Sequence, residues 1–337
     1  MSTSYQPPCT LTTSIINRVA EIAELIGQLS TQLDAQRDLR LRRIHRIRTI
    51  QGSLAIEGNT LSEAQITAIL EGKRVLAPPR EIQEARNALK AYDLLHTWQP
   101  AHERDLLGAH RTLMAELVDD AGSWRTGGVG VMAGEKVIHM APQAERVPQL
   151  MRQLLHWLAD TNAHPLIASS VFHYEFEFIH PFSDGNGRMG RLWQTLILTR
   201  WNPLFTEIPV ESLVYEHQEA YYKAIGESTQ QANAAPFVEF MLNRILEAVT
   251  LTAPQVTPHV TPQVQRLLVA LHGDMGREAL QDALGLRDRK SFRERYLKPA
   301  LQQSLIEMTL PDKPNSRLQR YRLTDEGRRY LAQVEEP

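Results

Sequence analysis

His180-Pro-Phe-Ser-Asp-Gly-Asn-Gly-Arg-Met-Gly-Arg191 is a polar stretch set between two apolar segments. Residues 170–179 before it are aromatic and apolar, and residues 192–198 after it resume an apolar pattern without the strict alternation of a strand. The sequence therefore predicts two core helices joined by a polar loop. Phe182 alternates with the polar residues of this loop, and we expect its ring to insert into the core and fix the loop.

The loop carries a candidate base and a candidate metal ligand. The imidazole of His180 can accept a proton near neutral pH. Asp184 is a hard oxygen ligand of the kind that Mg²⁺ takes when it also binds nucleotide phosphates. A second interpretation is a metal hydrolase, because His173, Glu177 and His180 could share one helical face.

The same loop is suited to binding an anion. Gly185, Asn186 and Gly187 allow a sharp turn that directs successive N–H groups at one point. If a helix starts at about Gly187, its dipole adds to this effect, and Arg188 and Arg191 lie three residues apart on one face. Both guanidiniums could then reach one polyphosphate. A glycine-rich turn is also typical of a plain surface loop, but the two flanking core helices favour a site.

The stretch resembles the signature of the Fic family, His-x-Phe-x-(Asp or Glu)-Gly-Asn-Gly-Arg-x-x-Arg, and meets every specified position. The resemblance implies a mainly α fold, with a Fic-type helical core and a small β-hairpin flap. It also implies a nucleotidyltransferase that moves AMP from ATP, with Mg²⁺ or Mn²⁺, to a Ser, Thr or Tyr hydroxyl of a target protein or of itself, and releases pyrophosphate. The phosphate-transferring, Doc-like branch lacks the second arginine and is disfavoured.

The resemblance also implies a role for each motif residue. His180 would be the general base, Asp184 would hold the metal against the α and β phosphates, and Asn186 with the glycine N–H groups would support the α-phosphate. Arg188 and Arg191 would bind the β and γ phosphates. Such transfer depends on positioning and charge stabilisation, which suits these roles. The residues of the motif expected to bind nucleotide are Asp184, Gly185, Asn186, Gly187, Arg188, Met189, Gly190 and Arg191.

A second motif lies upstream, at Ser53-Leu-Ala-Ile-Glu57-Gly58. It places a hydroxyl and a carboxylate on one face of a helix that Gly58 can end, and from the residues alone Glu57 is a solvated residue at a helix end. The motif resembles the inhibitory helix of Fic proteins in the class where that helix precedes the core. This implies that Glu57 pairs with Arg191, competes with the γ-phosphate and keeps the chain largely inactive. Some relatives use this Glu to remove AMP, and that second activity stays open here.

Residues 124–132 and 136–140 read as two short strands around a turn at 133–135. In the Fic family a hairpin here, about 124–142, is the flap on which the target segment docks by strand addition. Val131, Met132, Ile138 and Met140 are the candidate contacts with nucleotide or target. Alternatively, these apolar side chains pack the hairpin onto the body.

Tyr221-Tyr222-Lys-Ala-Ile resembles the family segment whose tyrosine lies near the adenine, so Tyr221 is a candidate nucleotide contact. A buried tyrosine pair in a helix is equally typical of a core position. An asparagine that some relatives carry eight residues later is replaced by Thr229, which leaves the choice of base less defined than phosphate binding.

The chain is expected to divide into several parts. We predict an N-terminal helical region over 1–98 with the inhibitory helix at about 41–57, a catalytic core over 99–249, a proline-containing linker over 250–262 and a winged-helix-like domain over 263–337. Basic residues crowd the third helix of the last part, but acidic residues are interspersed, which favours a protein or homodimer contact over DNA. The alternative function is a DNA-binding regulator with a nucleotide-sensing Fic core; the intact base and arginines favour the enzyme.

Composition limits the remaining possibilities. The chain has 337 residues, 42% of them hydrophobic, with a net charge of -2 that indicates no general attraction to nucleic acid or membrane. Its single cysteine, Cys9, excludes an intramolecular disulfide. No apolar run has the length of a membrane span, and the polar N-terminus does not resemble a secretion signal, so a cytoplasmic protein is expected.

Overall fold

A computed structural model of the chain describes residues 5–33, 39–133, 136–252, 261–286, 288–310, 316 and 318–334. The chain divides into two compact units, Met1–Ala253 and Pro254–Pro337, and each is described by itself. The predicted mainly α fold is confirmed. The first unit contains α1 (Thr13–Leu33), α2 (Leu39–Ile56), α3 (Glu63–Leu70), α4 (Pro79–Leu94), α5 (Glu103–Leu113), β1 (Gly130–Ala133), β2 (Lys136–Met140), α6 (Val147–Asp160), α7 (Pro165–Ile179), α8 (Asn186–Trp201), α9 (Val210–Glu216), α10 (Gln218–Gln231) and α11 (Ala235–Thr252).

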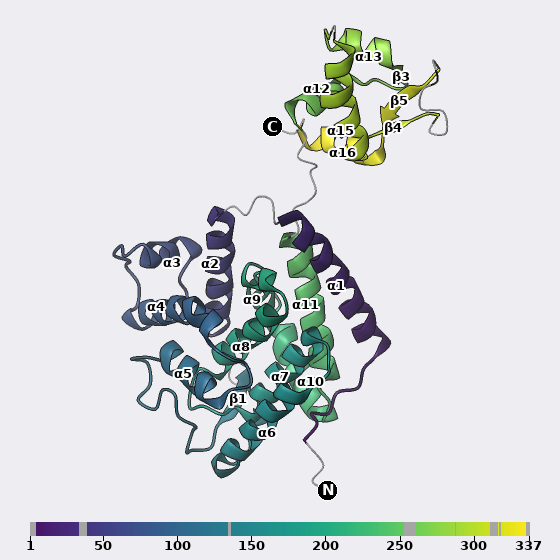
Figure 1. Ribbon diagram of the computed structural model, residues 1–337. Coiled ribbons are helices and arrows are strands. Elements are labelled where there is room, and N and C mark those ends of the chain that lie inside the picture. The colour runs from purple at the N-terminus through teal and green to yellow at the C-terminus, as the bar shows by residue number, and fades with distance from the viewer. Residues whose placement is uncertain are drawn as a thin grey trace. The chain divides into compact units, whose positions relative to one another are not determined.

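The helices α7 and α8 form the centre of the first unit, with the other helices arranged around them (Figure 1). Nearly every residue of α7 from Leu166 to Ile179 is buried, which explains why its sequence lacks a polar face. The two helices approach closely because Gly190 has no side chain: a Cβ there would lie 2.7 Å from Cδ2 of His173. This contact sets the distance between the two ends of the motif.

The N-terminal helices share one core with the helices around α7 and α8. Ile22 of α1, Ile50 of α2 and Leu89 of α4 belong to the same buried cluster as Phe172 and Trp193. The helix α1 lies along α11, and α2 lies along α9. The helices α1, α2 and α4 therefore pack as part of one body with the helices that follow, because their apolar faces are covered by those helices.

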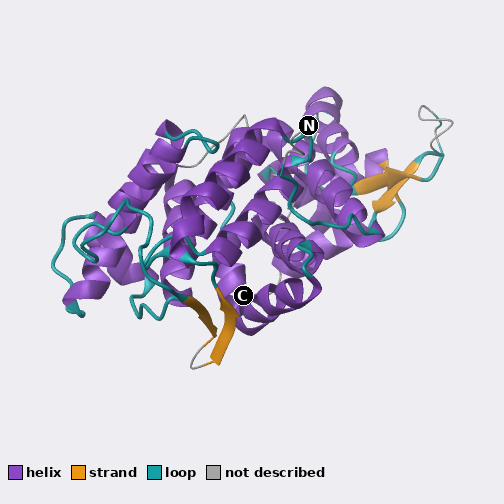
Figure 2. Ribbon diagram, turned by 90° about the horizontal axis from the view of Figure 1, so that it is seen from below, coloured by secondary structure: helices purple, strands orange, loops and turns teal. Residues whose placement is uncertain are grey.

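The hairpin is shorter than the sequence predicted. Its strands β1 and β2 pair antiparallel with Gly130 opposite Met140, and the register shifts between Val131 and Met132. Residues 124–129 are not part of the strand, because the Arg125 side chain and the two glycines at 127 and 128 give this segment a loop conformation held to the body. The hairpin projects from the helices at the edge of the unit (Figure 2).

The second unit has a helical part and a small sheet with its own core. It contains α12 (Pro262–Ala270), β3 (Met275–Gly276), α13 (Arg277–Ala283), α14 (Arg289–Phe292), a π-helical turn (Arg293–Leu297), α15 (Lys298–Gln302), β4 (Ile306–Met308), β5 (Arg320–Leu323) and α16 (Asp325–Val334). The strands form an antiparallel sheet in the order β3-β5-β4. The strand β3 has only two residues, which are too few to show an alternating pattern in the sequence.

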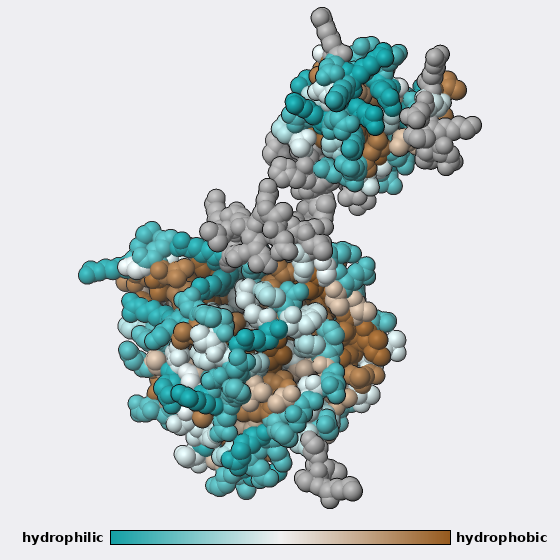
Figure 3. All heavy atoms as spheres, in the orientation of Figure 1, coloured by the Kyte–Doolittle hydropathy of each residue, from teal (hydrophilic) through white to brown (hydrophobic). Residues whose placement is uncertain are grey.

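The predicted linker over 250–262 is partly helical. The helix α11 continues to Thr252, since no proline or glycine lies between Pro236 in its first turn and Pro254, and α12 begins at Pro262. The intervening part of that prediction lies outside the described residues. Hydrophilic residues cover much of the visible face of both units, with the hydrophobic ones gathered in separate patches (Figure 3).

The close contact between α2 and α9 gives a test of this packing. A Cβ at Gly52 would lie 2.6 Å from the backbone N of Ser212, so Gly52→Ala must push the two helices apart. We expect it to lower the free energy of unfolding by about 1–3 kcal/mol in urea titrations. Gly27→Ala in α1 is the matched control, because nothing lies within 4 Å of its Cβ, and it should stabilise by up to about 1 kcal/mol. Equal effects of the two substitutions would contradict this packing.

Candidate active site

The end of α7 orients His180. This residue takes a left-handed backbone conformation, with φ 50°, and its N–H donates to the carbonyl of Phe176 at 2.8 Å. Its Nδ1 lies 3.3 Å from the carbonyl oxygen of Glu177 and 3.6 Å from Oε2 of the same residue. Because a carbonyl can only accept, this contact favours the tautomer with the proton on Nδ1. The Nε2 atom is then the basic nitrogen.

Glu177 gives this histidine a buried negative partner. Burial by itself would raise the pKa of its carboxyl, but the hydrogen bond and charge of His180, together with His173 and Arg191, outweigh that effect and lower it. The side chain of Glu177 is almost completely buried. A buried carboxylate thus lies beside the imidazole of His180.

The loop after His180 is held by Phe182 and Asn186. Phe182 is completely buried and stacks on His110, with ring centroids 3.6 Å apart, as the sequence predicted for this ring. The side chain of Asn186 accepts from the N–H of Phe182 at 2.8 Å and donates to its carbonyl at 2.9 Å. The resemblance placed this side chain against a phosphate. In the structure it is buried and bonded to the loop backbone, so its observed contribution is to the shape of the loop.

His110 is a site residue that sequence reasoning missed. Its Nδ1 accepts from the N–H of Gly122 at 2.8 Å, so its Nε2 carries the proton and donates to the carbonyl of Asp184 at 3.0 Å. Burial lowers the pKa of His110 to about 4, which keeps the ring neutral in this role. No signal in the sequence marks it, since it lies in the middle of an ordinary amphipathic helix 74 residues away.

Arg188 and Asp184 belong to a cluster of alternating charges. Arg188 is buried and lies 2.9 Å from Oδ1 of Asp184 and 3.3 Å from Oε1 of Glu84. Oδ2 of Asp184 accepts from Arg80 at 3.1 Å. Arg80 and Glu84 both come from α4, and the sequence did not indicate either. Asp184 is 39% exposed, so its carboxylate can be reached by a metal ion.

Arg191 is buried and is bound by Ser53 of α2 and by Glu57, the residue that follows this helix. Its Nε donates to Oγ of Ser53 at 3.2 Å, and its NH2 donates to the carbonyl of Ser53 at 3.0 Å and to Oε1 of Glu57 at 2.6 Å. The predicted ion pair between Glu57 and Arg191 is therefore present. Burial would lower the pKa of Arg191, but Glu57 and other nearby groups outweigh it and raise the pKa above its usual value.

The Glu57 carboxylate occupies the space over the first turn of α8. A Cβ added to Gly187 would collide with Oε1 of Glu57 and lie 3.0 Å from NH1 of Arg191. The N-terminus of α8 follows Gly185, which has a φ of 84°, and directs its first N–H groups toward this space. An anion bound there would take the place of the carboxylate.

These residues fit a metal-bound nucleotide phosphate. NH1 of Arg191 is a buried donor without a partner among the described residues, and it adjoins the space over α8. The same part of the chain has no group of three His, Cys, Asp or Glu side chains that could hold a metal ion by themselves. One accessible carboxylate, Asp184, together with phosphate oxygens is the usual way in which Mg²⁺ binds with a nucleotide.

Comparisons with known proteins agree with this geometry. Residues 100–198 match the Fic/DOC family, and residues 262–324 match the family described as Filamentation induced by cAMP protein Fic-like, C-terminal domain. The crystal structure of a Fic family protein from Desulfovibrio desulfuricans is 54% identical, with a TM-score of 0.73 over 95% of this chain and 99% of that one. The chain belongs to the Fic family.

More distant Fic proteins are similar over part of their length. The protein adenylyltransferase Fic of Aedes aegypti is 29% identical over 250 residues, which are 66% of this chain and 48% of that protein. The protein adenylyltransferase fic-1 of Caenorhabditis briggsae is 31% identical over 202 residues, or 56% of this chain and 38% of that protein. The chain thus spans about half, or less, of the length of these curated relatives.

Tyr221 is a core residue and not an accessible contact for a nucleotide. It is 2% exposed, and its hydroxyl lies 3.1 Å from Nε2 of His173. Nδ1 of His173 lies 2.6 Å from Oε1 of Gln194, so it carries the proton, and Tyr221 donates to Nε2. The rotation of α10 about its axis directs Tyr221 toward α7 and leaves the neighbouring Tyr222 half-buried. The charges of Glu57 and Arg191 both influence the pKa of Tyr222.

The metal-hydrolase interpretation is also wrong. Both ring nitrogens of His173 have partners, in Gln194 and Tyr221, and are unavailable to a metal ion. Burial lowers the pKa of His173 to about 4, so the ring is neutral. Glu177 faces His180 as well as His173. His173 therefore joins Gln194 and Tyr221 in the core, and Glu177 lies between the two histidines, 3.8 Å from Nε2 of His173 and 3.6 Å from Nδ1 of His180.

Arg125 connects the hairpin to the motif. Its side chain donates to the carbonyls of His180 at 2.7 Å and Gly127 at 2.7 Å, and also to Pro142. Arg125 thereby supplies hydrogen bonds to a carbonyl at the end of α7 and to the carbonyls of Gly127 and Pro142, which lie on either side of the hairpin. Of the four flap candidates, Met140 is 68% exposed, whereas the side chains of Val131, Met132 and Ile138 lie outside the described residues.

None of the described helices has both the length and the apolar character that a membrane span requires.

The neutral state of His110 predicts a pH dependence of stability. Its pKa is about 4 in the folded chain and 6.5 at its ordinary value, so its contribution is complete above about pH 6.5 and is lost as the pH falls toward 4. We expect a loss on the order of 1 kcal/mol per pH unit for this group in urea titrations. His173 adds a similar effect.

His110→Gln is the variant that tests this assignment. An amide can accept from Gly122 and donate to Asp184 as the ring does, but it does not titrate. The variant should therefore lose stability less steeply than the wild type between pH 6.5 and 4.5. Parallel curves for the two proteins would show that His110 does not carry this dependence.

Proposed function

We propose that this Fic protein is an autoinhibited protein adenylyltransferase, which transfers AMP from ATP to a Ser, Thr or Tyr hydroxyl of a target protein or of itself. The observation that carries the proposal is the placement of Arg191. It belongs to a motif with an intact base and metal ligand, yet Ser53 and Glu57 bind it. The adenylyltransferases among the chain's relatives support the choice of reaction.

His180 acts as the general base. Its Nε2 takes the proton of the acceptor hydroxyl while the hydroxyl oxygen forms a bond to the α-phosphorus, and the bond from that phosphorus to the bridging oxygen of pyrophosphate breaks. Nδ1 keeps its proton because it faces the backbone carbonyl and the carboxylate of Glu177. The buried carboxylate stabilises the imidazolium that results.

The phosphates are held by the turn at 185–187 and by two arginines. Arg188 and Arg191 neutralise the charge of the β and γ phosphates, and the first N–H groups of α8 support the α-phosphate. Asp184 would hold Mg²⁺, or Mn²⁺, which would neutralise charge on the phosphate oxygens. In the structure the carboxylate of Asp184 is paired with Arg80 and Arg188.

Inhibition follows from competition for one guanidinium. With Glu57 in place, NH2 of Arg191 is bound at 2.6 Å and the carboxylate fills the space over α8. A γ-phosphate in that space would meet the charge of Glu57, so ATP binds without the geometry needed for attack. Activity therefore requires the end of α2 to withdraw from α8. The same carboxylate could direct a water molecule for removal of AMP, which an assay on a modified target would detect.

The hairpin is the proposed docking site for the target. Its two strands pair only with each other among the described residues, so each has a free edge that can bind an extended segment. Arg125 fixes the base of the hairpin to the carbonyl of His180. A segment added to this edge would therefore be held at a set distance from the base.

Removing the inhibitory carboxylate should raise activity. We expect Glu57→Gly to increase incorporation of label from α-labelled ATP roughly ten- to hundredfold, because a charged hydrogen bond to Arg191 is lost. Glu71→Gly is the matched control: Glu71 also follows a helix and pairs with an arginine of α2, Arg43, at 2.6 Å, but lies outside the motif. It should leave incorporation unchanged.

The double variant Glu57→Gly/His180→Ala tests the base. We expect it to lose incorporation by about 10²-fold or more relative to Glu57→Gly. Label that persists in the double variant would contradict the mechanism, and unchanged label in Glu57→Gly would contradict the inhibition. Label from CTP or UTP in place of ATP would change the substrate and keep the chemistry.

We further propose that the second unit recruits the protein target. A cavity of about 990 Å³ between its helices and β5 is lined by basic side chains, with two glutamates among them. The basic members are Arg277, Arg289, Lys290 and Arg293. The alternative, a DNA-binding regulator, rests on the same residues. The glutamates at 278 and 294 weaken attraction to a uniformly anionic duplex and are compatible with a mixed protein surface.

Lys290→Glu in the Glu57→Gly background separates these possibilities. It should reduce labelling of proteins in a lysate severalfold and leave self-labelling unchanged. Arg328→Glu, on α16 of the same unit, is the control. Salt-dependent binding of duplex DNA that Lys290→Glu abolishes would favour the regulator instead.

A further inference from the structure

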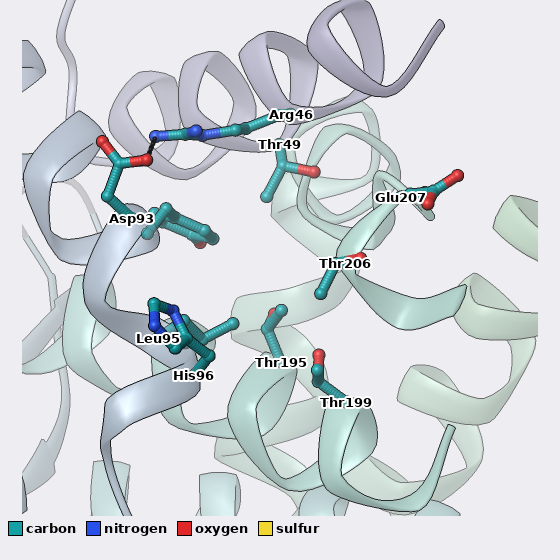
Figure 4. A pocket seen from close by; sticks show the side chains of 10 residues that line it. Arg46, Thr49, Asp93, Leu95, His96, Thr195, Thr199, Thr206 and Glu207 are labelled. Atoms are coloured by element: carbon teal, nitrogen blue, oxygen red, sulfur yellow. Dashed lines mark ion pairs between the residues drawn. The ribbon is translucent and has the colours of Figure 1, made fainter. Parts of the chain in front are cut away.

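A second cavity, of about 270 Å³, lies between α2 and α8 and is closed by the end of α4 and by residues 203–207. Arg46 and Thr49 of α2 face Thr195 and Thr199 of α8 across the central space, with Thr206 at one side (Figure 4). None of the residues that line it belongs to the motif. It is slightly smaller than sites for drug-sized ligands, which are roughly 300–1,000 Å³, so it suits a ligand on the order of ten heavy atoms.

The cavity lies one helical turn from the contact between Ser53 and Arg191 on both helices. Thr49 precedes Ser53 by four residues on α2, and Thr195 follows Arg191 by four residues on α8. Four residues are about one turn of an α-helix, so each pair shares a helical face. A change in the separation of α2 and α8 at the cavity is therefore transmitted to the contact between Ser53 and Arg191.

A hydrogen-bonded cluster in the cavity wall lies beside the same contact. The hydroxyl of Tyr92, which lines the cavity, donates to Oε1 of Glu211 at 3.2 Å, and Thr195 donates to the same oxygen at 2.6 Å. One turn away on α2 and α8, Ser53 accepts from Nε of Arg191. Ser53, Thr195 and Glu211 are buried and Tyr92 is partly buried, which makes their mutual positions sensitive to a ligand in the cavity.

The lining indicates the chemical class of the ligand. Nε of Arg46 and Oγ1 of Thr199 are buried and have no partner within the described residues. Arg46 is paired with Asp93 at 2.7 Å, and the carboxylate of Glu207 also lines the cavity. The lining therefore has one guanidinium and two carboxylates, a balance of charge that disfavours an anionic ligand. The carboxylates can accept hydrogen bonds from hydroxyl groups, the guanidinium N–H can donate one, and a tyrosine ring lies beside them. This set of groups suits an uncharged polyhydroxyl compound.

We propose that this cavity binds an uncharged, polyhydroxyl ligand of monosaccharide size, which bridges α2 and α8 and stabilises the arrangement in which Glu57 holds Arg191. A ligand that binds only this arrangement shifts the equilibrium toward it. The regulatory consequence rests on the proposed autoinhibition, whereas the binding itself does not. Such a ligand would report the supply of a sugar or polyol to the inhibited protein.

Ligand binding is tested on the full chain by saturation-transfer NMR with D-glucose and D-ribose, and with glucose 6-phosphate as the charged counterpart. We expect binding of a neutral sugar and none of the phosphate ester. Thr199→Val keeps the shape of the side chain and removes the hydroxyl, and should weaken binding by about three- to tenfold. Thr250→Val, an exposed position on α11, is the control and should change nothing.

Coupling to the inhibitory contact is read by hydrogen exchange. The bound sugar should slow exchange of the amides at 49–57 by threefold or more in the wild type, and this effect should disappear in Thr199→Val. Absence of sugar binding, equal binding of glucose 6-phosphate, or binding that Thr199→Val does not weaken would overturn the site. Binding without slower exchange would overturn the coupling.

Neither measurement requires nucleotide transfer. If Glu57→Gly proved inactive with every nucleotide while the sugar still bound at Thr199, the proposed function would fail and the binding site would stand. If Glu57→Gly were active and no sugar bound, only the inference about the cavity would fail.

Discussion

The buried guanidinium of Arg191 is the group on which the rest of the first unit depends. A charge removed from water is costly unless it has a partner, and here Ser53 and Glu57 supply the partners. The helix α2 must therefore lie against α8, and Gly52 permits the close contact with α9 that keeps it there. One atom, NH1, is left as a buried donor without a partner in the described structure. The segment proposed to inhibit the enzyme thus also supplies the counter-ion of Arg191.

Arg191 is not the only arginine of the motif that is paired in this way. Arg188 is buried as well, and Asp184 and Glu84 balance its charge. In this state each arginine of the motif is neutralised by carboxylates of the protein itself. The proposed substrate would replace these carboxylates with phosphate oxygens. In this proposal nucleotide binding exchanges ion pairs and does not capture an anion with free cations. The affinity for nucleotide would then depend on how strongly Glu57 and Glu84 bind the two arginines.

The neutral histidines and Arg125 give the site its rigidity. His110 and His173 each donate one hydrogen bond and accept another, which only the uncharged ring can do, and burial keeps both rings uncharged. His110 holds the carbonyl of Asp184, and His173 joins α7 to α8 and α10. Arg125 binds the backbone of His180 and the base of the hairpin. The catalytic loop is therefore held from several sides before any ligand arrives.

The sequence by itself determined the two central helices and the buried Phe182 between them, because these features follow from residues close together in the chain. The pairing of Glu57 with Arg191 did not follow from the residues alone and was implied by the resemblance of both motifs to the Fic family. The sequence did not indicate His110, Arg80, Glu84 or Arg125, because each reaches the loop from 55 to 104 residues away and carries no local pattern. The tertiary structure also decided that Tyr221 is in the core, since the phase of α10 against α7 depends on packing. It decided the cavity beside Thr199 too, because a space between helices exists only once they are packed.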